Sequence, residues 1–110
     1  MDKISLAAVA SEELQAARDT SSGRASKTVY GDRTHSLRQT VIALVGGAAL
    51  NEHDSPGEAT VFVLQGRVEL SAGDDVSTGV SGDLLIVPGE RHALTALEDS
   101  VVVLTVALRH

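Results

Sequence analysis

The sequence predicts an all-β protein, an antiparallel sandwich or jelly-roll barrel with one short helix near the N-terminus. After residue 24, turn residues such as Gly46-Gly47 and Gly82-Asp83 interrupt the chain at close intervals. The apolar segments between the turns have the length of strands, and no helical pattern separates one segment from the next. Parallel strands need long crossover connections, usually helices, so we expect antiparallel sheets.

The composition limits the classes of function. A chain of 110 residues has room for one core, and the only aromatic residues are Tyr30 and Phe62, which makes ring stacking of sugars or bases unexpected. The formal net charge of −6 opposes nucleic-acid binding, and no apolar run approaches the roughly 20 residues of a membrane span. The absence of cysteine fits a reducing compartment, so we expect a cytoplasmic protein without nucleic-acid or membrane partners.

Residues 1–24 are predicted to form a helical arm, and residues 25–110 the barrel. Ser11 is the expected N-cap, with Glu12 and Glu13 in the first turn, where carboxylates suit the helix dipole. Leu14 and Ala17 give this helix only a narrow apolar stripe.

Nine strands are predicted, each bounded by turn residues. They span residues 25–30, 35–45, 48–53, 60–65, 68–72, 75–80, 84–87, 92–97 and 101–108. Gly66-Arg67 is interpreted as the tight turn of a hairpin between the fourth and fifth strands.

The last strand is apolar on both of its faces. Val102 and Leu104 alternate with Val101 and Val103, and a barrel interior absorbs only one of these two sets. Residues 41–45 are likewise apolar on both faces of their strand. Because the stripe of the helix is narrow, we expect a second subunit to cover the outer set, which predicts a homodimer.

Two segments carry a pattern that is specific to a family. His53 follows Gly47 with five residues between them, and the segment continues to Gly66; the second segment runs from Gly82 through Pro88 to His92. The pair resembles the two motifs of the cupin superfamily over residues 35–108. The resemblance implies an RmlC-like jelly roll, a double-stranded β-helix. It implies no single activity, because the superfamily includes oxygenases, isomerases, sensors and storage proteins.

The metal ligands of the family are only partly present. The resemblance places His53 and His92 at two ligand positions, but Ser55 stands where a second histidine is expected and Ala59 where a glutamate is expected. The second motif is also one residue short after Pro88. A catalytic transition-metal site generally takes three protein ligands, so a divalent metal would be bound weakly or not at all unless His35 supplies the third ligand.

Alternation along the strands outlines a pocket. An inward Ala59 brings Val61 and Val63 inward, and an inward His35 brings Gln39 inward. The opposite register of that strand places Arg38 and Thr40 inside, where Arg38 would favour an anionic ligand. The predicted pocket residues are His35, Gln39, His53, Ser55, Val61, Val63 and His92.

Three functions fit these observations. The first is a cupin that binds an unidentified small molecule around His53 and His92. The alternative is a metal-dependent enzyme of oxygenase or isomerase type with an unusual third ligand. The third is an interaction or structural protein without a working pocket. No glycine-rich phosphate loop opens a helix, so no nucleotide cofactor is expected.

Overall fold

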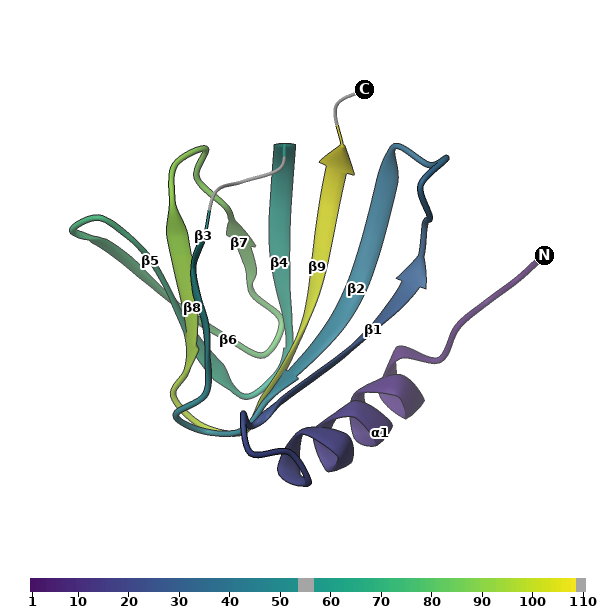
Figure 1. Ribbon diagram of the computed structural model, residues 1–110, viewed down its shortest axis with the longest axis horizontal. Coiled ribbons are helices and arrows are strands. Elements are labelled where there is room, and N and C mark those ends of the chain that lie inside the picture. The colour runs from purple at the N-terminus through teal and green to yellow at the C-terminus, as the bar shows by residue number, and fades with distance from the viewer. Residues whose placement is uncertain (54–56, 109–110) are drawn as a thin grey trace.

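The computed structural model describes residues 1–53 and 57–108, with the backbone alone for residues 52 and 53. Within these residues the chain forms one helix and nine antiparallel strands (Figure 1). Their bounds are α1 Leu6–Arg18, β1 Arg24–Tyr30, β2 Leu37–Leu44, β3 Ala49–His53, β4 Gly57–Gln65, β5 Arg67–Ala72, β6 Asp75–Val80, β7 Leu84–Ile86, β8 His92–Ala96 and β9 Ser100–Leu108. The bounds of the strands lie within three residues of those expected from the turn residues.

The strands form two sheets that face each other. One sheet has the order β1-β2-β9-β4-β7 and the other the order β3-β8-β5-β6. Figure 1 shows the sheets converging near the C-terminal end of α1 and spreading apart at the opposite end, where β3 and β9 finish and β4 begins. We call the latter the wide end of the sandwich. A core of aliphatic side chains fills the space between the sheets, with Leu44, Val63, Val68 and Val102 fully buried.

The expected hairpin at Gly66-Arg67 is wrong, because β4 and β5 belong to different sheets. The chain turns a corner there, against the start of β9. Gly66 has a φ of 90°, and a Cβ at this position would collide with Ser100 Oγ and the Asp99 carbonyl oxygen. The Arg67 backbone N–H donates a hydrogen bond to Ser100 Oγ at 3.0 Å, which holds the corner in place. A turn dipeptide shows where a strand ends but does not show which sheet the next strand joins.

Helix α1 begins earlier than expected. Its N-cap is Ser5, whose hydroxyl accepts a hydrogen bond from the Ala8 backbone N–H at 3.2 Å, and Ser11 lies inside the helix. The capping pattern at Ser11 was therefore misleading, since the preceding alanine-rich segment has a high helix propensity of its own. The longer helix buries Val9 and Ala10 in addition to Leu14 and Ala17.

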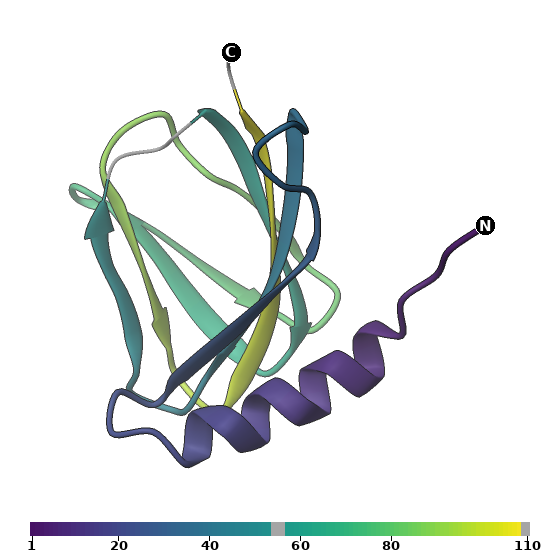
Figure 2. The same ribbon diagram turned by 45° about the vertical axis from the view of Figure 1, so that its right-hand side comes forward.

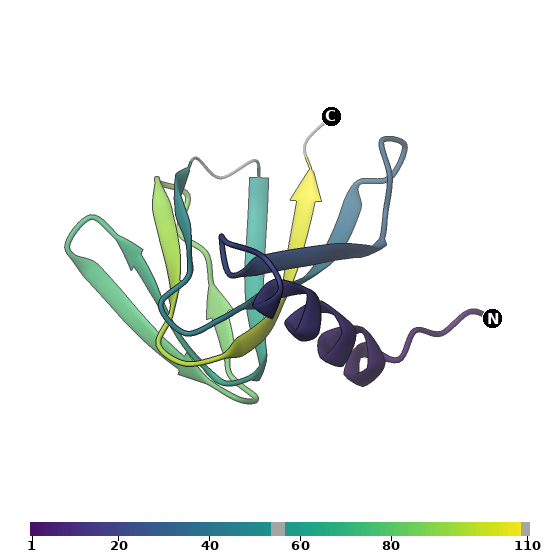
Figure 3. The ribbon, with the colours of Figure 1, turned by 60° about the horizontal axis from the view of Figure 1, so that its bottom comes forward.

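This longer helix covers the outer face of the five-stranded sheet. A second core, distinct from the one between the sheets, joins the buried side of α1 to Val41, Ala43, Val101 and Val103. Figures 2 and 3 show α1 lying along the side of the molecule that carries β1. The expectation that a second subunit covers this face is therefore wrong, because the same chain covers it. The predicted homodimer itself stays a prediction, without this argument in its favour.

Among residues 1–53 and 57–108, the only helix is α1, and it is too short to cross a bilayer.

Candidate functional site

The two motif histidines lie opposite each other at the wide end. β3 and β8 pair antiparallel, with the Cα of His53 in register with the Cα of His92 and the Cα of Leu50 in register with that of Leu94. Three residue steps on β3 therefore match two steps on β8, so the ladder contains a bulge at residues 51–52. Bulges of this kind often occur beside functional sites, where they change which residue faces its partner.

His92 is a buried imidazole in a fixed orientation. It is 6% exposed, and its Nδ1 lies 2.9 Å from the Glu90 carbonyl oxygen. A carbonyl oxygen accepts hydrogen bonds and does not donate them, so Nδ1 carries the proton of this contact. In the neutral ring, Nε2 then carries the lone pair and is the nitrogen that can accept a hydrogen bond.

His92 lines a small cavity between the two sheets. The cavity has a volume of about 30 Å³, and the other described side chains around it are aliphatic: Ile42, Leu50, Val61, Leu70, Val87, Leu94, Val102 and Leu104. This volume holds roughly one or two water molecules, far less than the roughly 300 Å³ at the lower limit of typical small-molecule pockets. Only a group of that size would fit inside, and any larger molecule would have to lie mostly outside this cavity.

The structure decides the register of β2. Ile42 lines the cavity, whereas Val41 packs beneath α1 on the outer face. Alternation then places Arg38 and Thr40 on the inner face with Ile42, and Gln39 on the outer face. Gln39 Nε2 donates a hydrogen bond to Thr105 Oγ1 at 3.2 Å, across the β2–β9 ladder. The prediction of Gln39 in the pocket is therefore wrong. Residues 41–45 are apolar on both faces, so hydropathy alone did not distinguish the two registers.

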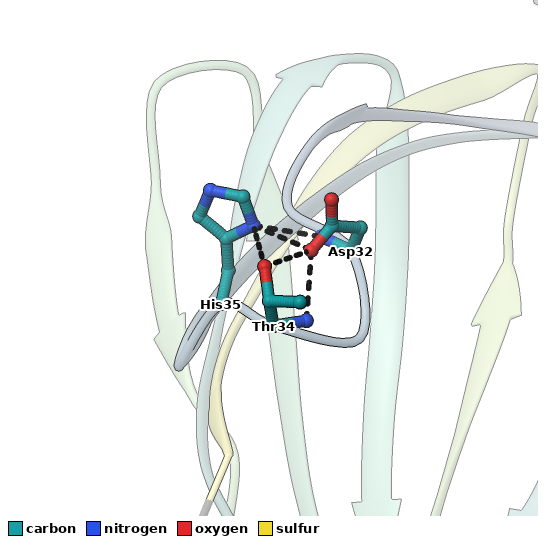
Figure 4. A network of polar contacts seen from close by, with 3 residues as sticks. All are labelled: Asp32, Thr34 and His35. Atoms are coloured by element: carbon teal, nitrogen blue, oxygen red, sulfur yellow. Dashed lines mark hydrogen bonds and ion pairs between the residues drawn. The ribbon is translucent and has the colours of Figure 1, made fainter.

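His35 lies in the connection between β1 and β2, in a polar network of its own (Figure 4). Its Nδ1 is 2.7 Å from Asp32 Oδ1, and its ring makes an edge contact with Tyr30, with 5.2 Å between the ring centroids. Hydrogen bonds from the Thr34 hydroxyl and backbone, together with His35, hold the pKa of Asp32 well below its usual value. This network positions the loop, and the imidazole of His35 is half-exposed to solvent.

The described residues hold no group of three or more histidine, aspartate or glutamate side chains arranged for a metal ion. His35 and His92 therefore do not belong to one such cluster within the described part of the chain. The side chain of His53 and all of Ser55 lie outside the described residues, so their predicted roles stay predictions.

The two predicted valines have different positions. Val61 lines the cavity beside His92, as expected. Val63 is fully buried but does not line the cavity, because it lies deeper in the core, beside Gly79 of β6. The cavity residues that sequence reasoning omitted include Leu50 and Val87. Leu50 faces inward as the partner of Leu94, and that pairing becomes visible only with the β3–β8 register.

Comparisons with known proteins give a consistent fold. No protein-family model matches the chain, and no curated protein sequence matches it significantly. Among solved structures, a conserved protein of unknown function from Streptococcus pyogenes is 28% identical, with a TM-score of 0.73 over 83% of this chain and 79% of that chain. An RmlC-like cupin protein from Desulfovibrio desulfuricans is 25% identical, with a TM-score of 0.66 over 76% of this chain and 81% of that chain. A cupin superfamily protein from Desulfitobacterium hafniense is 17% identical, with a TM-score of 0.72 over 78% of each chain.

Proposed function

Because this chain is a small cupin-domain protein, we propose that it binds a small molecule at the wide end of its sandwich, with His92 as the polar anchor. One observation carries the proposal: a buried imidazole lines a cavity whose other described side chains are aliphatic. Small-molecule sites typically combine an apolar wall with a few polar groups that fix the orientation of the ligand. His53, which lies opposite His92 in the ladder, is the proposed second polar contact.

The orientation of His92 supports this role. Its Nδ1–H is engaged by the Glu90 carbonyl, which fixes the ring and makes Nε2 the acceptor in the neutral form. A ligand hydroxyl or amide N–H that reaches Nε2 gains a directional hydrogen bond in surroundings of low polarity, where such bonds are strong. The small volume of the cavity restricts that group to about the size of a water molecule or a methyl group.

The experiment uses nuclear magnetic resonance with a panel of small carboxylates, primary amides, polyols and monosaccharides. We expect at least one class to shift the backbone amide resonances of β3 and β8. His92→Gln should weaken that binding at least tenfold, because it removes the imidazole acceptor. His35→Gln is the matched control and should bind like the wild type, since His35 belongs to the separate loop network. Wild-type affinity in His92→Gln would contradict the proposal.

A metal-dependent enzyme is the second candidate, and the same two histidines favour it. An Nδ1–H that donates to a backbone carbonyl is the usual support for a histidine that binds metal through Nε2. The described residues, which do not include the side chain of His53, supply no group of three ligands, whereas a catalytic metal site generally takes three. We expect first-row metal well below one ion per chain after dialysis. Elemental analysis that finds one tightly held ion per chain would favour the enzyme over the binding protein.

A further inference from the structure

Arg38 lies on the inner face of the five-stranded sheet, at the wide end. One rung of the ladder carries Arg38 of β2, Val106 of β9 and Ala59 of β4 as successive partners. Val106 and Ala59 belong to the core between the sheets, so this rung faces the interior. The Val87 backbone N–H donates to the Ala59 carbonyl oxygen at 3.1 Å, and Val87 shares the cavity wall with His92. The backbone of Arg38 therefore belongs to a rung that ends beside Val87, at the wall of the candidate site.

Along β2 and toward β1, the neighbours of Arg38 on this face carry hydroxyl groups, whereas its partner on β9 is the apolar Val106. Thr40 is the next inward residue of β2, and its Oγ1 lies 3.3 Å from Oγ1 of Thr28 on β1. Arg38 is half-buried, and the ion pairs found among residues 1–53 and 57–108 join Arg18 to Asp99 and His35 to Asp32. No carboxylate in the described part of the chain therefore neutralises Arg38.

We infer that the ligand is a small carboxylate, whose carboxylate group binds Arg38 while its opposite end reaches the cavity beside His92. This inference rests on the proposed function and adds the chemical class of the ligand. A guanidinium presents two parallel N–H donors that match the two oxygens of a carboxylate, and it keeps its charge at any physiological pH. The aliphatic cavity wall suits a short hydrocarbon chain, and Nε2 of His92 suits a hydroxyl group on that chain.

Because the chain is negatively charged overall, a preference for carboxylates over uncharged molecules would point to a local cation in the site. The chain has a formal net charge of −6, so its average field repels anions. A preference for a carboxylate over an uncharged molecule of the same shape therefore requires a local cation. Arg38 is a cation that the register places on the inner face at this end.

The experiment compares straight-chain carboxylates of two to six carbons, with and without a terminal hydroxyl, with the primary amides of the same chains at pH 7. The wild type should bind the preferred carboxylate at least tenfold more tightly than its amide. Arg38→Gln should abolish this preference, and Arg38→Lys should retain part of it, because lysine keeps the charge without the paired donors. Arg33→Gln, in the exposed β1–β2 loop, is the matched control and should keep the full preference.

A second measurement does not depend on how the variants fold. In the wild type, the carboxylate should shift the Nε–Hε resonance of Arg38, and the amide should not. Binding of amides or polyols that depends on His92, without a preference for carboxylates, would overturn this inference and leave the proposed function standing. Failure of every probe to bind would overturn both, whereas a preference that survives Arg38→Gln would overturn the role of Arg38 alone.

Discussion

Arg18 Nη2 lies 3.0 Å from Asp99 Oδ2, so an ion pair joins the last turn of α1 to the turn that precedes β9. Asp99 Oδ1 also accepts a hydrogen bond from the Gly46 backbone N–H at 2.9 Å. One carboxylate thereby connects the helix, the turn after β2 and the start of β9. These elements all take part in the second core beneath the helix.

The charge of Asp99 should stabilise the fold, and this stabilisation should be lost as Asp99 is protonated in acid. The Gly46 backbone hydrogen bond, and then Arg18, hold the pKa of Asp99 below its usual value. A carboxyl whose pKa is lower in the folded state stabilises the fold above its unfolded pKa of about 3.9, and that contribution is lost as the pH falls further. Asp99→Asn keeps an acceptor for Gly46 but removes the charge. Urea denaturation should therefore show a smaller loss of stability between pH 6 and pH 3 in this variant than in the wild type; an equal loss would contradict the assignment.

Leu14 should contribute more to stability than any exposed leucine. It is 6% exposed and packs between α1 and the outer face of the sheet. Leu14→Ala should lower the free energy of unfolding by about 2–4 kcal/mol, because truncation of a buried leucine leaves a cavity. Leu97→Ala is the control, since Leu97 is 43% exposed, and should change the free energy by less than about 0.5 kcal/mol. Similar urea midpoints for the two variants would mean that the helix does not cover this face in solution.

The same face bears on the oligomeric state. Val102 faces the core between the sheets and Val103 faces α1, as alternation predicted, but both are buried within one chain. Val102→Asp and Val103→Asp should therefore both destabilise the fold of the chain, because each buries an unpaired charge. Light scattering of the wild type at micromolar concentration tests the homodimer prediction, and a mass near 11.4 kDa would contradict it.

Sequence reasoning succeeded where residue type determines local geometry. Glycine, proline and aspartate at the turns located all nine strands, and the resemblance of residues 82–92 to a cupin motif pointed to His92, which is buried. It failed where the outcome depends on pairing between distant segments. The corner after β4, the bulge in β3 and the inward face of β2 are all fixed by partners far away in the sequence. Gln39 was misplaced for this reason, because its strand offers two apolar faces.

The corrected register makes Gln39 a test of the site. Its amide is bonded to Thr105 on the outer face, away from the cavity. Gln39→Ala should therefore leave the binding of the preferred probe within about twofold of the wild type, whereas Thr40→Val, on the inner face, should weaken it. Titrations monitored by nuclear magnetic resonance separate the two outcomes, and a large loss in Gln39→Ala alone would support the opposite register.

The corner between the two sheets gives the sharpest comparison of stability. Gly66 and Gly82 have φ values of 90° and 92°, so alanine at either position meets the same backbone strain. Their surroundings differ, because a Cβ at Gly82 meets nothing within 4 Å, whereas a Cβ at Gly66 collides with Ser100 Oγ and the Asp99 carbonyl. Gly82→Ala should cost about 1–2 kcal/mol from the left-handed backbone alone. Gly66→Ala should cost about 1–3 kcal/mol more, because β9 must shift to make room. Urea denaturation of both variants measures the difference, and equal costs would show that β4 does not pass against the start of β9 as described.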